Sequence, residues 1–152
     1  MPNPSNASRQ FVWPYLSTAL VSLVGLGDAI YLTVQDVTGQ SLQCTVIAGC
    51  SEVLSSKYAH IGSIPLAAVG AFAYFIFFSL AVLAAFGHGF ARPLLLTLVS
   101  FMFLTSLWLF YLQAFKIHHF CQYCLLSAAV TTILTAIVWG TRIVSRKTNR
   151  SS

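Results

Sequence analysis

Cys121 and Cys124 are the residues whose type and spacing most directly suggest chemistry. Two side chains three residues apart share one face of a helix, so the two sulfurs can bridge. If a helix begins here, the first cysteine lies next to the partial positive charge of the helix N-terminus, which favours the thiolate over the thiol. Lys116, His118 and His119 come just before the pair and are expected to add to that effect. Because the thiolate is the attacking species in thiol–disulfide exchange, the pair is predicted to be redox-active.

A second pair, Cys44 and Cys50, lies in a polar stretch earlier in the chain. Two other uses of four cysteines compete with redox chemistry. A zinc site usually takes its ligands from tight knuckles, whereas five residues separate Cys44 from Cys50. Purely structural disulfides are the other alternative, but a bridge from Cys121 to Cys124 closes almost no loop and removes little entropy from the unfolded chain. Redox chemistry without a metal is therefore the preferred interpretation.

The elements that position these cysteines belong in a membrane. The 152-residue chain is 57% hydrophobic and 7% charged, against about 25% charged in a typical soluble domain. A soluble fold could not cover its surface with so few charges. The net charge is +5, and four of the eight basic residues lie at the C-terminal end, which fits an anchor at a lipid surface; no nucleic-acid partner is expected. The basic residues there are Arg142, Arg146, Lys147 and Arg150.

Four apolar stretches are long enough to cross a bilayer as helices, which takes roughly 20 residues. None alternates polar and apolar residues as a membrane-spanning strand would. The predicted helices cover about residues 11–34, 61–86, 93–115 and 120–143, with Pro14 and Pro65 in first turns. Short links between the last three helices predict antiparallel neighbours, hence one all-α domain over 1–152, a four-helix integral membrane bundle. The long polar loop, about 35–60, must then lie against the bundle beside the link at 116–119.

The basic residues also predict the orientation, since cytoplasmic segments carry more lysine and arginine. Arg9, Arg92 and the C-terminal cluster fall on one side, and Lys57 and Lys116 fall on the other. Both termini are therefore expected in the cytoplasm of a multi-pass cell (inner) membrane protein, with the long loop and all four cysteines extracytoplasmic. Residues 1–10 are polar and no signal peptide is evident, so the first helix is expected to remain in the mature protein.

Several short motifs are spread along nearly the whole chain. They are Cys44, Cys50-Ser51, Val53, Ser55-Ser56-Lys57-Tyr58, Ile64-Pro65-Leu66, Gly70, Tyr74 and Phe120-Cys121-Gln122-Tyr123-Cys124. Together they resemble the motifs of the bacterial vitamin K epoxide reductase homologues. The loop pair comes first and the Cys-x-x-Cys last, which is the reverse of the order in the analogous bacterial quinone-linked thiol oxidases.

The resemblance implies a relay of two electrons. A secreted or periplasmic thioredoxin-like partner would be oxidised by a Cys44–Cys50 disulfide, and Cys50 would pass the electrons to Cys121. Cys124 would face a quinone, with Ser56 at the family's active-site serine position near the ring. The acceptor would be ubiquinone, menaquinone or phylloquinone. Many bacterial members carry a fused thioredoxin-like domain after the fourth helix, whereas this chain ends at Ser152, so a separate partner is expected.

Two positions depart from the animal members, which carry an asparagine and a tyrosine where this chain has about Gly62 and Ala128. Neither can hydrogen-bond through a side chain, so quinone reduction is the expected reaction and epoxide reduction the alternative. A membrane scaffold with structural disulfides is the non-catalytic alternative. Asp28 lies inside the first helix, where a carboxyl group is costly and is a functional candidate by default. It would either hydrogen-bond neighbouring helices or handle protons.

Overall fold

A computed structural model describes residues 4–40 and 49–150, and within them four helices are long and apolar enough to cross a membrane. The helices are α1 (Pro4–Thr38), α3 (Leu66–Ala85), α4 (Ala91–Leu112) and α5 (Gln122–Arg150). Helix α1 packs against α3 and α5, and α4 closes the ring by contacting the same two helices. This confirms the all-α four-span bundle and makes the chain a multi-pass membrane protein.

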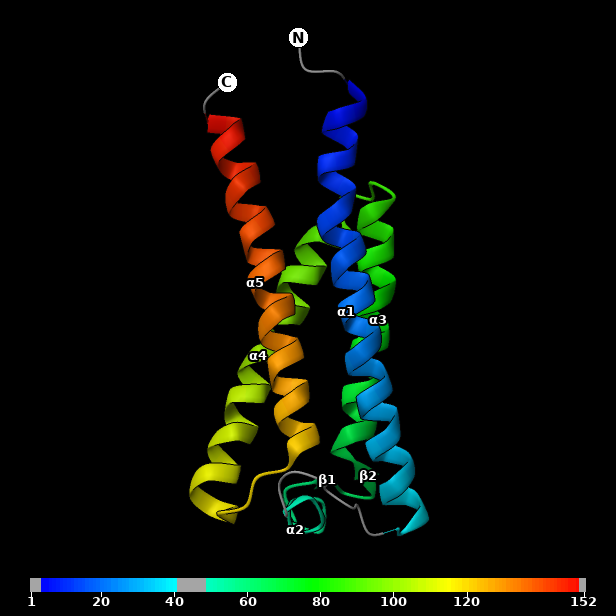
Figure 1. The fold of residues 1–152 in the computed structure, drawn as a ribbon, viewed down its shortest axis with the longest axis vertical. Coiled ribbons are helices and arrows are strands. Elements are labelled where there is room, and N and C mark those ends of the chain that lie inside the picture. The colour runs from blue at the N-terminus through cyan, green and yellow to red at the C-terminus, as the bar shows by residue number, and fades with distance from the viewer. Residues whose placement is uncertain (1–3, 41–48, 151–152) are drawn as a thin grey trace.

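The start of α1 and the end of α5 lie at one end of the bundle, and the remaining short elements lie at the other (Figure 1). These short elements are α2 (Cys50–Leu54), β1 (His60–Ile61), β2 (Ile64–Pro65) and the π-helical turn η1 (Gln113–Ile117) that extends α4. Helix α2 and the strands β1 and β2, which follow α1 in the chain, therefore lie at the same end as the α4–α5 link, as the loop lengths predicted.

Helix α1 is longer at both ends than the predicted 11–34, because an apolar stretch sets the length of a span but not the length of a helix. The expectation that Pro14 lies in the first turn is wrong, since the helix already begins at Pro4. The hydroxyl of Ser17 donates to the Pro14 carbonyl over 2.8 Å. Near the other end, Asp36 accepts a 2.9 Å hydrogen bond from His60, which ties α1 to β1.

Helix α3 begins at Leu66, five residues later than predicted, because residues 60–65 form a small antiparallel hairpin. Gly62 makes the turn with φ of +68°, a conformation that residues with a Cβ avoid. Pro65 accordingly lies just before the helix and not in its first turn. Helix α3 ends two residues before a glycine: the N–H groups of Gly87 and His88 donate back to the carbonyls of α3's last turn, both over 3.1 Å.

Tyr74 of α3 ties three helices together. Its hydroxyl lies 2.8 Å from the hydroxyl of Ser127 and 2.9 Å from that of Thr131, both on α5. Its ring lies against α1 at Gly25, where a Cβ atom would overlap the ring. A close helix contact is therefore present at Gly25, whereas Gly27 has no atom within 4 Å of the position that a Cβ would take.

Replacing Gly25 with alanine is expected to destabilise the bundle by about 1–3 kcal/mol, because the added methyl group must displace the Tyr74 ring. Gly27→Ala is the matched control on the same helix, where the methyl group meets open space and helix propensity favours alanine. Reversible unfolding in mixed detergent micelles measures both variants. Equal stability of the two would contradict this packing.

Candidate functional site

Cys121 is the residue immediately before α5 and acts as the cap of that helix. Its carbonyl accepts the N–H of Leu125 over 3.0 Å, the first bond of the helix. The backbone N–H groups of Tyr123 and Cys124 donate to its sulfur, in the positions where a capping side chain accepts hydrogen bonds. The N–H of Cys121 itself donates to Oε1 of Gln113 over 3.0 Å, and both residues are buried. Because Gln113 belongs to η1, this hydrogen bond lets η1 hold the backbone of Cys121 in place.

Hydrogen bonds to the sulfur of Cys121 stabilise its thiolate form. Donation from the Cys124 side chain is the largest influence, and together with the two backbone N–H groups it outweighs burial and lowers the pKa of Cys121 from 9.0 to about 7. The predicted lowering is present, and the backbone N–H groups of the helix N-terminus contribute to it as expected, whereas the larger influence of Cys124 was not predicted. Lys116, His118 and His119 are exposed and are not among the groups that lower this pKa.

Cys50 is the first residue of α2, takes part in a disulfide and is 1% exposed. Its predicted partner, Cys44, lies outside the described residues. Cys121 and Cys124 are free thiols. A disulfide at Cys50 does not fit the zinc alternative, which needs that sulfur as a thiolate.

The two cysteine-bearing segments meet at the end of the bundle. Cys50 and Cys121 belong to one cluster of buried residues with Leu32 and Val53, and Cys124 packs against it. Gly49 allows this approach: a Cβ there would lie 2.8 Å from the carbonyl oxygen of Phe120. The structure therefore brings together three of the four predicted redox residues.

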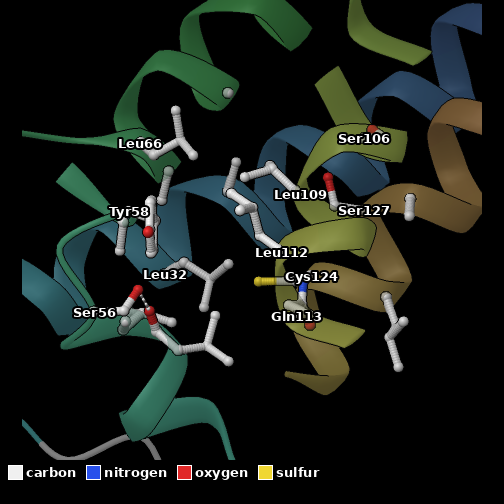
Figure 2. Close-up of a pocket in the computed structure, with 18 of the residues that line it drawn as sticks. Leu32, Ser56, Tyr58, Leu66, Ser106, Leu109, Leu112, Gln113, Cys124 and Ser127 are labelled. Carbon is white, nitrogen blue, oxygen red and sulfur yellow. Dashed lines mark hydrogen bonds between the residues drawn. The ribbon is translucent and has the colours of Figure 1, made fainter. Parts of the chain in front are cut away.

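Next to this cluster lies an apolar cavity of about 150 Å³. A dry cavity on the order of 150 Å³ is large enough to hold a benzene ring. Figure 2 shows the sulfur of Cys124 pointing into the space among leucine side chains from three elements. The labelled leucines are Leu32, Leu66, Leu109 and Leu112.

Polar side chains lie at two opposite sides of this cavity (Figure 2). Ser56 and Tyr58 come from the segment after α2, and Ser106 and Ser127 come from α4 and α5. An apolar slot with hydroxyl groups on two sides suits a flat ring that carries two opposed carbonyl oxygens. In this structure the Ser56 hydroxyl donates to the Val53 carbonyl over 2.7 Å, so the hydroxyl must rotate away from Val53 before it can donate a hydrogen bond to a ligand.

Asp28 and Ala128 also line the cavity, whereas Gly62 does not. The methyl group of Ala128 offers no hydrogen bond at the place where the animal members are expected to have a tyrosine. Asp28 Oδ2 is buried and has no hydrogen-bond partner among the described residues.

The fold and the site define a class of protein: a multi-pass membrane protein that carries a thiol pair beside an apolar cavity at one end of its bundle. The model of the vitamin K epoxide reductase family matches residues 16–139, most of the chain. The chain belongs to this family, which confirms the resemblance drawn from the cysteine motifs. It is therefore an oxidoreductase of the membrane, from a family that acts with quinones.

Three features of the site were not predicted from the sequence: the contact at Gly49, the bond from Cys121 to Gln113, and the Asp36–His60 pair. Each depends on residues that are distant in the chain or in separate elements. Of these three features, only the contact at Gly49 had an indication in the local sequence, because a glycine directly before a reactive cysteine permits the close approach of another backbone segment.

Cys124→Ala should raise the pKa of Cys121, because it removes the strongest hydrogen-bond donor to that sulfur. In the wild-type protein with a reduced pair, Cys121 should be half thiolate at about pH 7, with the thiolate increasing above that pH. Thiolate absorbance, measured over a pH titration against a Cys121→Ser blank, reports the midpoint. Cys124→Ser is the matched control, since its hydroxyl can still donate. The same midpoint in the alanine and serine variants would contradict the assignment.

Proposed function

We propose that this protein is a thiol–quinone oxidoreductase that oxidises the dithiol of a secreted thioredoxin-like partner and so supports disulfide bond formation. One observation carries the proposal: Cys124 points into the apolar cavity while it hydrogen-bonds Cys121, which shares a buried cluster with Cys50. These contacts are the ones that thiol–disulfide exchange would need to carry electrons from Cys50 to the cavity. The orientation that suits this role has both termini in the cytoplasm and the cysteines outside.

The first half of the relay is thiol–disulfide exchange. A partner thiolate attacks the Cys44–Cys50 disulfide, and the second partner thiol completes its own disulfide, leaving Cys44 and Cys50 reduced. Cys50 then attacks Cys121 in the oxidised helix pair, which frees Cys124. Attack of Cys44 on Cys50 restores the loop disulfide and leaves Cys121 and Cys124 reduced, the state that the helix pair has in this structure.

The second half takes place at the cavity. A quinone, when bound, accepts two electrons and two protons. Cys124 is the thiol that reaches the cavity, and Cys121 completes the disulfide as the electrons leave. Ser56 would hold one carbonyl oxygen from the α2 side, and the leucine walls exclude water. Burial of Cys121, which is 0% exposed, keeps solvent oxidants from the pair.

Epoxide reduction is the alternative within the family, and a non-catalytic scaffold is the alternative outside it. Ala128 and Gly62 weigh against the epoxide reaction, since neither position presents a hydroxyl or an amide to the cavity. A scaffold has no use for a free thiol pair beside an apolar cavity, and a Cys121 pKa of about 7 is unusual for a merely structural cysteine.

Purified protein in lipid nanodiscs should consume reduced thioredoxin and menadione in equal molar amounts. Cys44→Ala should abolish oxidation of thioredoxin, because a folded protein cannot reach the buried pair, but should retain menadione reduction driven by dithiothreitol. Thiol titration and quinone absorbance measure the two reactions. Failure of the wild-type protein to reduce menadione with either donor would reject the proposal, and equal loss of both reactions in Cys44→Ala would reject the division between the pairs.

A further inference from the structure

Asp28 is an ionisable residue that lines the cavity and that has no role in the relay described above. It lies within the membrane-spanning part of α1 and lines the cavity together with Cys124 and Ser127. Its Oδ2 atom is fully buried and has no hydrogen-bond partner among the described residues. A buried carboxyl group without a hydrogen-bond donor is costly inside a membrane span, and such groups are functional candidates. A structural role as a helix–helix bond, which the sequence left open, is therefore not supported.

Among the described residues that line the cavity, none has a basic side chain that could pair with Asp28. The titratable groups that line the cavity are Asp36 on α1, Tyr58 before β1 and Cys124 on α5, while Tyr74 of α3 bonds the lining residue Ser127. Asp36 already has a partner, His60. No lysine, arginine or histidine is among the described residues that line the cavity. A carboxyl group in such a place can reduce its charge only by binding a proton.

Asp28 also acts on the thiol pair. Donation from Cys124 dominates the pKa of Cys121, and the negative charge of Asp28 works in the opposite direction. A proton on Asp28 therefore favours the Cys121 thiolate, and a thiolate favours a proton on Asp28. The carboxyl group and the thiol pair are electrostatically linked across the cavity wall.

We propose that the Asp28 carboxyl group transfers a proton between the Cys121–Cys124 thiol pair and the electron acceptor in the cavity. This inference rests on the proposed function. Starting from the state in which both sulfurs carry a proton, formation of the disulfide breaks two S–H bonds, and the pair gives up two electrons and two protons, which is what a quinone takes up. One proton passes to Asp28, which gives one to an acceptor oxygen, and the other thiol proton goes to the second oxygen. Asp28 ends as it began, so the reaction balances without a further reactant.

The test uses full-length protein in nanodiscs, with the helix pair reduced and excess dithiol removed before menadione is added. Asp28→Asn keeps the size of the side chain but cannot transfer a proton. It should slow single-turnover menadione reduction by about 10²-fold or more, as expected for loss of general acid–base catalysis. Its affinity for menadione should stay close to that of the wild-type protein. Asp28→Glu should restore most of the rate.

Two readouts do not depend on turnover. Infrared difference spectra between the oxidised and reduced pair should contain a carboxyl band in the wild-type protein, and Asp28→Asn should lack it. The thermal stability of Asp28→Asn should be no lower than that of the wild-type protein, because no hydrogen bond of Oδ2 is lost.

A wild-type single-turnover rate in Asp28→Asn, or a marked loss of stability in parallel with the rate, would overturn the proton-transfer role. A wild-type protein that fails to reduce menadione would instead reject the proposed function. The infrared band separates the two failures, since it reports the link between Asp28 and the thiol pair without an acceptor.

Discussion

The close approach of two chain segments at one end of the bundle is the constraint on which the rest of the site depends. Gly49 lies against the backbone of Phe120, and the cysteines that follow these two residues, Cys50 and Cys121, become buried in one cluster. Thiol–disulfide exchange requires direct contact between sulfurs, so electrons can pass from loop to helix only if backbones come this near. Any side chain at position 49 would have to push the segments apart.

The start of α5 serves structure and chemistry with the same hydrogen bonds. A helix needs its first N–H groups satisfied, and the sulfur of Cys121 accepts two of them. The same donors stabilise the thiolate, which is the form that reacts. Gln113 completes the arrangement by accepting the N–H of Cys121, so that a buried polar group of η1 is satisfied and the cysteine is held in place.

The cavity then separates the exchange chemistry from the transfer to an acceptor. Cys124 stands one turn along α5 from Cys121 and faces the apolar walls, and Asp28 reaches the same space from α1. Leucine side chains make up much of the lining, so a side chain that can carry a proton has a use there. The buried Oδ2 of Asp28 has no hydrogen-bond partner among the described residues, and the proposed role in proton transfer accounts for a carboxyl group in that place.

The sequence was sufficient for the features that depend on composition and local spacing. Four apolar stretches predicted the four spans, and the spacing of Cys121 and Cys124 predicted a pair at the start of a helix. Helix ends were less accurate: Pro14 and Pro65 were misplaced because polar residues extend α1 and a hairpin precedes α3.

Contacts between distant segments could not be predicted. No local pattern marks Gln113 as the acceptor for Cys121, and none pairs Asp36 with His60. The roles of Cys44, Cys50, Cys121, Cys124 and Ser56 stay predictions.

The most direct test of the relay is a search for the disulfide between Cys50 and Cys121. From the state described here, with Cys50 in a disulfide and the helix pair reduced, the Cys121 thiolate can attack Cys50. Cys124→Ala removes the thiol that resolves this bond from the helix side, while Cys44 can still resolve it from the loop side. Peptide mapping of the acid-quenched, non-reduced Cys124→Ala protein should therefore find a fraction with Cys50 joined to Cys121 and Cys44 free, and adding Gly49→Ala should lower that fraction. A map showing only Cys44–Cys50, with Cys121 unmodified, would mean that the two pairs do not communicate and would contradict the account.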